Sequence, residues 1–365
     1  KEMIKHELEI VTSGEKSGDI VLVKDGSVDN LGKEGYTLAI DDMIEIKSNY
    51  ETGILYGGIS ITQMFSQNDG MNNVAKGLAR DYPKYDVRAG MLDVARTYIP
   101  MEYLQEMTIY MAYYKLNEVQ VHVNDYWGAT GYSAFRLECD TYPMITATDG
   151  SYTKEEYRQY QIDMKNYGIN VITEIDTPYH AECFRNVPGV KMLKAGALDI
   201  REQSSYDVIE AVLDEYLDGS NPVIQSDKFH IGTDEYDKSY SEQMRKWTDH
   251  FINYVNDKGY DTRLWGSLGS RGFNGTTPVS NDATVNLWAP YWADVKETYN
   301  AGYDIINTCG GWLYIVPGAN AGYPDRLDIA SLYDKFDVNN FSPSRNAGQG
   351  TAIMPIAHPQ TKGGQ

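Results

Sequence analysis

The chain has 365 residues, of which 42% are hydrophobic, and its 52 acidic and 32 basic residues give a formal net charge of -20. A negative protein repels nucleic acids and anionic membranes, so this balance argues against polyanion binding and favours a neutral or cationic ligand. The 30 tyrosines and 6 tryptophans outnumber the 8 phenylalanines, so most aromatic rings carry a polar group, as in proteins that contact carbohydrate.

The cysteines and the hydropathy pattern exclude several other classes. Cys139, Cys183 and Cys309 are far apart and form no C-x-x-C pair, so we expect neither a disulfide framework nor a metal site. No window of about 18 apolar residues occurs, and the first residues lack the apolar core of an export signal. We therefore expect no transmembrane segment, and any export signal would lie outside this chain.

The N-terminal part predicts a small α+β domain over residues 1–83. Short alternating strands are expected at 20–23, 36–40 and 43–47, and residues 52–65 carry apolar side chains at helical spacing. From residue 84 the pattern changes to strands that alternate with helices. This alternation indicates parallel crossovers, either in an α/β barrel or in an open doubly wound sheet.

Seven strands are expected in the second domain, residues 84–365, and each ends in a polar or aromatic residue. A doubly wound sheet usually concentrates its site at one switch point with a glycine-rich loop, and no such loop is present. The distribution therefore favours an α/β fold of the (β/α)8 TIM-barrel type, preceded by the α+β domain. Residues 351–365 stop where an eighth strand should begin, so we expect the barrel to be incomplete at this end. The seven strands are predicted at 87–95, 118–124, 170–176, 228–234, 262–266, 284–288 and 304–309.

The most informative segment is His230-Ile-Gly-Thr-Asp-Glu235, in which two adjacent carboxylates follow a short apolar strand. Strand ends are where α/β barrels hold their catalytic residues. An isolated Asp-Glu pair is more commonly a solvated loop. The rest of the chain decides between these interpretations.

Several motifs in order resemble glycoside hydrolase family 20, the β-N-acetylhexosaminidases, whose signature is H-x-G-x-D-E at the end of the fourth barrel strand. Residues 88–96 (RAGMLDVAR) are similar to the family's first strand, residues 114–125 (YKLNEVQVHVND) to its second, and residues 168–181 (GINVITEIDTPYHA) to its third. The N-terminal unit is similar to the family's accessory domain. A series of spaced motifs is a stronger signal than any single one.

The resemblance implies substrate-assisted hydrolysis, in which the 2-acetamido oxygen of the sugar is the nucleophile. Asp234 would orient the acetamido group and stabilise the oxazolinium intermediate, and Glu235 would be the general acid and base. Asp125 and His180 match a relay coupled to the acid, and Asp176 matches a supporting carboxylate. No cofactor and no metal are implied, and the anomeric configuration would be retained.

The resemblance also implies sugar-binding residues. Arg88 is matched to an arginine that binds the O3 and O4 hydroxyls, and Trp265 and Trp288 to tryptophans that enclose the sugar. Tyr314 is matched to a tyrosine that donates to the acetamido oxygen, with Trp312 or Tyr291 as alternatives for this contact.

The leading hypothesis is an exo-acting β-N-acetylhexosaminidase that removes terminal β-linked GlcNAc or GalNAc from an oligosaccharide or glycoconjugate. One alternative is a lacto-N-biosidase-like enzyme of the same family, which Arg88 disfavours because a donor clamped on O3 leaves no room for a further sugar. Another is a non-catalytic carbohydrate-binding barrel, which the intact Asp234 and Glu235 disfavour. Val316 stands where the family commonly has Asp or Asn, so the choice between gluco and galacto sugars stays open. We expect an extracellular or cell-surface location.

Overall fold

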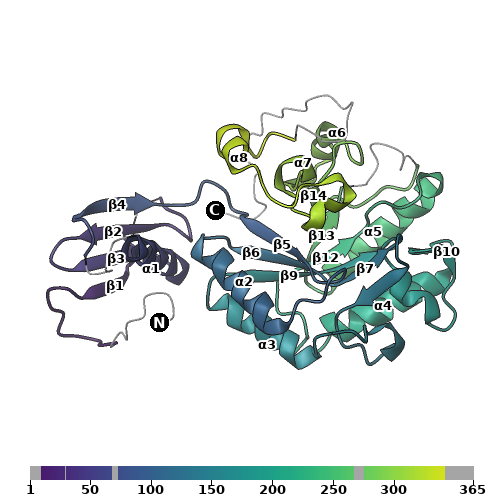
Figure 1. Ribbon diagram of the computed structural model, residues 1–365, viewed down its shortest axis with the longest axis horizontal. Helices are drawn as coiled ribbons and strands as arrows, with labels where there is room; N and C mark the ends of the chain where they lie inside the picture. Colours follow the sequence, from purple (N-terminus) through teal and green to yellow (C-terminus); the bar gives the residue numbers. More distant parts are fainter. Residues whose placement is uncertain (1–9, 29, 68–72, 267–274, 342–365) are drawn as a thin grey trace. The chain divides into compact units, whose positions relative to one another are not determined.

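The computed structural model describes residues 10–28, 30–67, 73–266 and 275–341 (Figure 1). The chain divides into two compact units. The first contains residues 1–90, 102–119 and 162–170, and the second contains residues 91–101, 120–161 and 171–365. The domain boundary that the sequence predicts near residue 83 stays a prediction.

A four-stranded sheet and one helix form the N-terminal part of the first unit (Figure 1). The strand order is β1-β3-β2-β4, with β1 parallel to β3 and with β2 antiparallel to both β3 and β4. Alternate residues of β2 are buried, which gives the sheet one apolar face, and Tyr56 and Ile61 of the helix belong to the same core. The elements are β1 (Ile20–Lys24), β2 (Tyr36–Ile40), β3 (Ile44–Ser48), α1 (Glu51–Ser66) and β4 (Gly77–Asp81).

The predicted strands and helix of this unit are present within a residue or two of the expected bounds. The sequence did not predict β4, because all five of its residues are exposed and it carries no apolar alternation.

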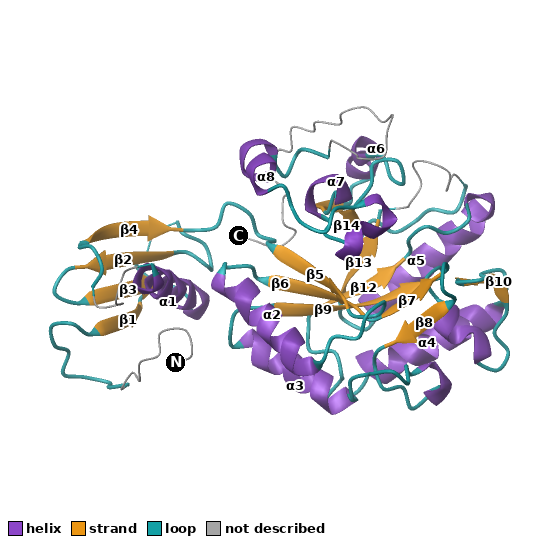
Figure 2. Cartoon of the chain, in the orientation of Figure 1, coloured by secondary structure: helices purple, strands orange, loops and turns teal. Residues whose placement is uncertain are grey.

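A seven-stranded sheet carries the strands of the predicted barrel (Figure 2). Its strands are neighbours in chain order, and the pairs from β9 to β15 are parallel. With helices between successive strands, this is the arrangement of a (β/α) barrel. The strands are β5 (Ala89–Asp93), β6 (Glu118–His122), β9 (Asn170–Thr177), β12 (Lys228–Gly232), β13 (Asp261–Trp265), β14 (Thr284–Leu287) and β15 (Asp304–Asn307).

All seven predicted barrel strands are confirmed. The central strands are almost wholly buried, as expected of parallel strands that are covered on both faces, whereas β5 and β15 are the edges of the sheet and are more exposed. The segment at 351–365, where an eighth strand was expected, lies outside the described residues.

The helices lie on the outside of this sheet (Figure 2). In the long helix after β12, the buried side chains recur at helical spacing from Met244 to Val255, so one stripe faces inward. The helices are α2 (Met101–Tyr113), α3 (Lys154–Lys165), α4 (Gln203–Leu217), α5 (Ser241–Asp257), α6 (Val295–Asn300), α7 (Gly310–Leu313) and α8 (Ile329–Lys335), with 3-10 turns η1 (Pro143–Ile145), η2 (Glu182–Asn186), η3 (Lys238–Tyr240) and η4 (Pro317–Gly322).

Two hairpins follow the C-terminal ends of central strands. The hairpin of β7 (Asn124–Trp127) and β8 (Tyr132–Phe135) comes after β6, and that of β10 (Met192–Lys194) and β11 (Ala197–Leu198) comes after β9. The sequence predicted one strand through Asn124, but the structure ends β6 at His122 and begins a separate strand at Asn124. Asp125 therefore lies on the hairpin and not on the barrel strand.

Candidate active site

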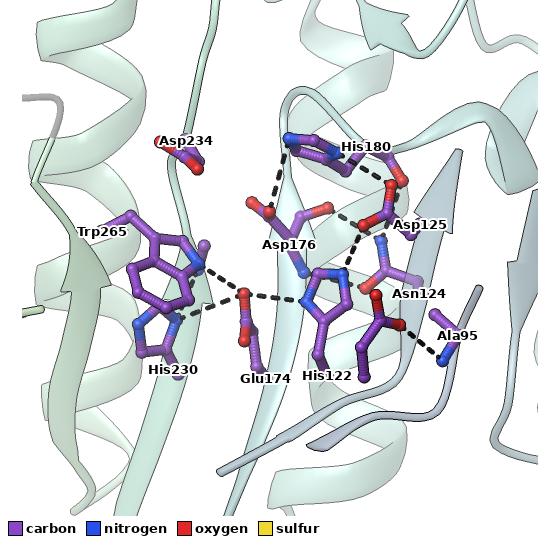
Figure 3. A network of polar contacts seen from close by, with 12 residues as sticks. Ala95, His122, Asn124, Asp125, Glu174, Asp176, His180, His230, Asp234 and Trp265 are labelled. Atoms are coloured by element: carbon purple, nitrogen blue, oxygen red, sulfur yellow. Dashed lines mark hydrogen bonds and ion pairs between the residues drawn. The ribbon is translucent and has the colours of Figure 1, made fainter. Parts of the chain in front are cut away.

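Carboxylate and histidine side chains gather at the C-terminal ends of neighbouring strands (Figure 3). Asp93 ends β5, Asp125 follows β6, Asp176 lies near the end of β9, and Asp234 follows β12. Parallel strands bring these ends to one edge of the sheet, which is the edge where barrels hold their sites.

The chain turns sharply where β12 ends. Gly232, Thr233 and Glu235 have φ values of 75°, 74° and 48°, in the left-handed region that L side chains rarely adopt. A Cβ at Gly232 would meet Oδ1 of Asp176 at 2.0 Å, so this position also needs glycine for space. The backbone N–H of Gly232 donates to Nδ1 of His230 over 3.1 Å, which gives the histidine of the motif a structural role. Strained backbone concentrated here fits a functional site.

Asp234 is held by the tryptophan at the end of β14. The indole N–H of Trp288 donates to Oδ1 of Asp234 over 3.0 Å, and the backbone N–H of Glu235 donates to the same atom over 3.0 Å. Burial raises the pKa of Asp234 well above its usual range, and the charges of Glu235 and Asp176 add to the rise. The positive charge of His180 opposes this rise.

The predicted relay is assembled in the structure. Nδ1 of His180 lies 2.9 Å from Oδ1 of Asp125, and Nε2 of His180 lies 3.5 Å from Oε2 of Glu235. Burial would lower the pKa of His180, but the charges of Asp125 and Asp176 raise it well above its usual value. The geometry therefore joins Asp125, His180 and Glu235 through one imidazole.

Asp176 stands beside this relay. Its Oδ2 lies 3.9 Å from Nε2 of His180, and its backbone N–H and C=O are both bound by the amide side chain of Asn124. Burial raises the pKa of Asp176 to about 7, with the charge of His180 opposing the rise. This position is compatible with the supporting role that the family resemblance implies for Asp176, and that role stays a prediction.

Three aromatic residues line one side of the carboxylates. Trp265 and Trp288 pack in one cluster, and the ring of Tyr314 stacks on Trp288 with centroids 6.3 Å apart and planes 14° apart. Burial raises the pKa of Tyr314 well above its usual value, and the charge of Asp234 adds to the rise. Tyr291 also touches Trp288, whereas Trp312 packs against Phe336.

The structure does not bring Arg88 to this cluster. Arg88 precedes β5, at the opposite end of the strand from Asp93, and its guanidinium binds Glu34 at 2.8 Å, the hydroxyl of Tyr56 and the carbonyl of Lys115. These contacts lie within the first unit and give Arg88 a structural role.

Arg96, in contrast to Arg88, lies beside these carboxylates. Its side chain, 37% exposed, lies 2.7 Å from Oδ2 of Asp93 and 2.7 Å from Oδ2 of Asp125. Arg96 was not predicted from the sequence. The available signal was its place after the C-terminal end of β5, whereas Arg88 precedes the strand.

Two buried residues below the relay were also missed. His122 on β6 contacts Asp125, and Glu174 on β9 accepts hydrogen bonds from Trp265 and Gln120 (Figure 3). Glu174 lies two positions before Asp176 on β9, so the two side chains point to the same side of the sheet, and His122 is the last residue of β6. Polar residues at alternating positions in a buried strand were the available signal.

Groups that could hold a metal ion occur among the described residues. Three groups of three side chains have donor atoms within 4.8 Å of one another. Each contains a histidine that already contacts a carboxylate of the same group. These are Asp93 with His122 and Asp125, His122 with Glu174 and Asp176, and His180 with Asp234 and Glu235.

Among the helices of the described residues, none combines the length and the apolar character that a membrane span requires.

Two family models match the chain in succession. "Glycosyl hydrolase family 20, domain 2" matches residues 1–82, and "Glycosyl hydrolase family 20, catalytic domain" matches residues 85–365. The second match covers most of the chain.

Curated proteins and solved structures agree with these models. Beta-hexosaminidase 1 of Coccidioides posadasii is 25% identical over 86% of this chain and 60% of its own length. A lacto-N-biosidase of Bifidobacterium bifidum is 25% identical over 93% of this chain and 31% of its own length. This chain thus spans less than two thirds of either relative. An exo β-N-acetylglucosaminidase structure from Vibrio harveyi, 20% identical, matches 90% of this chain and 58% of its own with a TM-score of 0.70, which supports the fold.

Proposed function

The chain belongs to glycoside hydrolase family 20, and on that premise we propose that it is a retaining exo-β-N-acetylhexosaminidase. It would remove terminal β-linked GlcNAc or GalNAc from a glycan without a cofactor. The observation that carries this proposal is the contact of His180 with both Asp125 and Glu235, next to an Asp234 that Trp288 holds in place.

In the proposed reaction the acetamido oxygen of the substrate attacks the anomeric carbon while Glu235 gives a proton to the leaving oxygen. The oxazolinium intermediate carries a positive charge, which the neighbouring carboxylate of Asp234 would stabilise. Water then attacks the anomeric carbon from the face opposite the acetamido oxygen. The bond between that oxygen and the anomeric carbon breaks, and Glu235 takes a proton from the water. Two displacements at one carbon retain the configuration.

His180 supports the acid in this scheme. When Glu235 has given up its proton, the imidazolium 3.5 Å away stabilises the new carboxylate. Asp125 in turn fixes the ring through Nδ1. The relay therefore acts on the step in which charge develops on Glu235.

The sugar would lie against the aromatic cluster. Trp265, Trp288 and Tyr314 offer ring faces for the apolar side of a pyranose. Arg96, which is partly exposed at the mouth, is the donor that we propose for the ring hydroxyls in place of Arg88.

The lacto-N-biosidase alternative has support from the curated relative of that name. It requires space for a second sugar at O3, where a hydroxyl donor such as Arg96 would interfere. The binding-only alternative has no evident use for a general acid coupled to a histidine relay, so an active hydrolase is favoured.

Side-by-side assays with p-nitrophenyl β-glycosides of GlcNAc, GalNAc and lacto-N-biose test the proposal. Release of p-nitrophenol from either monosaccharide substrate is the expected result. Exclusive release from the lacto-N-biose substrate would favour the alternative enzyme, and binding of GlcNAc without turnover of any substrate would favour the binding protein.

A further inference from the structure

His122 has a carboxylate at each of its two ring nitrogens, although its side chain is only 4% exposed. Nε2 lies 2.6 Å from Oδ2 of Asp125, and Nδ1 lies 3.0 Å from Oε1 of Glu174. The contact with Asp125 is a hydrogen bond. The contact with Glu174 is an ion-pair contact, in which Nδ1 makes no hydrogen bond. The histidine therefore links the relay carboxylate to the interior of the barrel (Figure 3).

Both carboxylates carry the hydrogen bonds expected of ionised groups. Oε1 of Glu174 accepts from the indole of Trp265 over 2.6 Å, and Oε2 accepts from Gln120 over 2.7 Å. In Asp125, Oδ2 contacts the side chains of His122 and Arg96, and Oδ1 contacts the ring of His180. Because an ionised carboxylate offers only lone pairs, a protonated nitrogen is favoured at both facing positions of His122.

The electrostatic surroundings agree with a charged ring. Burial would lower the pKa of His122, but the charge of Glu174 and the hydrogen bond with Asp125 raise it well above its usual value. Burial would likewise raise the pKa of Glu174, but the charge of His122 and its other contacts lower it to about 2. A desolvated imidazolium is stable only when charges of this kind surround it.

The groups that face His122 come from every element around it. The anions outnumber the cations, so one more positive charge is favourable in this part of the barrel. The acidic groups are Asp93 on β5, Asp125 on β7, and Glu174 and Asp176 on β9; the basic and neutral groups are Arg96, His180 and the buried His230, and burial lowers the pKa of His230 to about 4.

We propose that His122 is a permanently charged positioning residue of the relay, which holds Oδ2 of Asp125 so that Oδ1 stays directed at His180. This inference rests on the proposed hydrolase function for its effect on catalysis, but not for the charge of the ring. Arg96 shares Oδ2 from the solvent side, so His122 is the partner that fixes the carboxylate from inside the barrel.

Two amide variants separate the contacts of His122. The amide nitrogen of Gln lies about where Nε2 of His lies, so His122→Gln keeps a neutral donor to Asp125. The shorter amide of Asn lies about where Nδ1 lies, so His122→Asn keeps a donor toward Glu174 and leaves Asp125 without one. Comparing the two variants tests the contact with Asp125 against the presence of any polar group at this position.

The activity test measures kcat/KM against pH on p-nitrophenyl β-GlcNAc, which has a good leaving group, and on methyl β-GlcNAc, which has a poor one. We expect His122→Asn to lose roughly 10- to 100-fold more on the methyl glycoside than on the aryl glycoside, and His122→Gln to recover part of this loss. In both variants the alkaline limb should move to higher pH, because a buried positive charge is gone. Equal losses on both substrates with an unmoved pH profile would mean that His122 only supports the fold, and would overturn the proposal.

A second measurement does not depend on activity. Nitrogen-15 NMR of the imidazole rings, with His122 assigned by the signal that disappears in His122→Gln, should give imidazolium shifts at both nitrogens even at about pH 8. A neutral ring at that pH would overturn the proposal whether or not the protein hydrolyses any glycoside. Charged His122 in a protein without hexosaminidase activity would instead count only against the proposed function.

Discussion

Nε2 of His180 lies 3.5 Å from Oε2 of Glu235, while the other nitrogen of the same ring lies 2.9 Å from Oδ1 of Asp125. One imidazole thus joins a buried carboxylate to a carboxylate whose side chain is 35% exposed. A cation in this position stabilises Glu235 when it loses a proton. The exposed end of the relay is the end that a substrate can reach.

Glu235→Gln removes the transferable proton and keeps the shape of the side chain. We expect kcat on methyl β-GlcNAc to fall by roughly 10²- to 10⁴-fold, and kcat on p-nitrophenyl β-GlcNAc to fall much less, because its leaving group needs little protonation. Steady-state kinetics on both substrates measure the difference. The exposed Glu155, on α3, offers a control as Glu155→Gln, and equal losses on the two substrates would contradict the acid role.

A thiazoline analogue of the proposed intermediate should inhibit at far lower concentration than GlcNAc. The reason is that it mimics the bicyclic oxazolinium, which the site would bind more tightly than a ground-state sugar. Competitive inhibition constants for the thiazoline and for GlcNAc provide the comparison. Similar constants for both would remove the case for substrate assistance while leaving glycoside hydrolysis possible by another mechanism.

Arg96 and Arg88 should respond differently to the same substitution. Arg96→Gln removes a charged donor at the mouth of the site, so kcat/KM should fall by about 10- to 100-fold, in line with a hydrogen bond from a charged group. Arg88→Gln breaks a half-buried ion pair with Glu34, so the free energy of unfolding should fall by about 1–3 kcal/mol with kcat/KM little changed. Steady-state kinetics and urea unfolding of both variants test this difference. A large loss of kcat/KM in Arg88→Gln, with little loss in Arg96→Gln, would restore Arg88 as the sugar ligand.

The fold could be predicted from the sequence because its signals are local. Each barrel strand is a short apolar run bounded by polar residues, and the helix after β12 shows a clear apolar stripe. Strand β4 carries no such pattern, since all its residues are exposed, and only its pairing with β2 makes it a strand. Pairing between distant segments is the information that periodicity lacks.

The site was predictable as far as it followed strand ends. Asp125, His180, Asp234 and Trp288 meet as expected, whereas the choice of Arg88 over Arg96 depended on which end of β5 each residue occupies. His122 and Glu174 could not be identified from residue type, because an inward histidine is as compatible with a satisfied core residue as with a relay. Their contacts with Asp125 and Trp265 become visible only in three dimensions.

Asp176 should make the stability of the folded protein depend on pH. Burial raises its pKa from 3.8 to about 7, so between these values the folded protein keeps a proton that the unfolded chain loses. More bound protons in the folded state mean that the free energy of unfolding falls as pH rises through this window. Asp176→Asn removes that dependence, so between about pH 4 and pH 8 the variant should gain up to about 4 kcal/mol relative to the wild type, at about 1.4 kcal/mol per pKa unit. Urea unfolding of both proteins at several pH values tests this, and parallel pH profiles would contradict it.

Gly232 ends β12 just before Asp234 and Glu235, and Gly232→Ala should destabilise the protein more than an ordinary glycine replacement. Its Cβ would lie 2.0 Å from Oδ1 and 2.4 Å from Cα of Asp176, so the backbone of β9 would have to move as well as a side chain. Gly189 is a matched control, because it also has a positive φ but has no atom within 4 Å of an added Cβ. We expect Gly189→Ala to cost about 1–2 kcal/mol for the backbone conformation alone, and Gly232→Ala to cost about 3–5 kcal/mol, with loss of activity. Thermal unfolding of the two variants gives the comparison, and similar costs would mean that β9 yields easily and that Asp176 is not held against the turn.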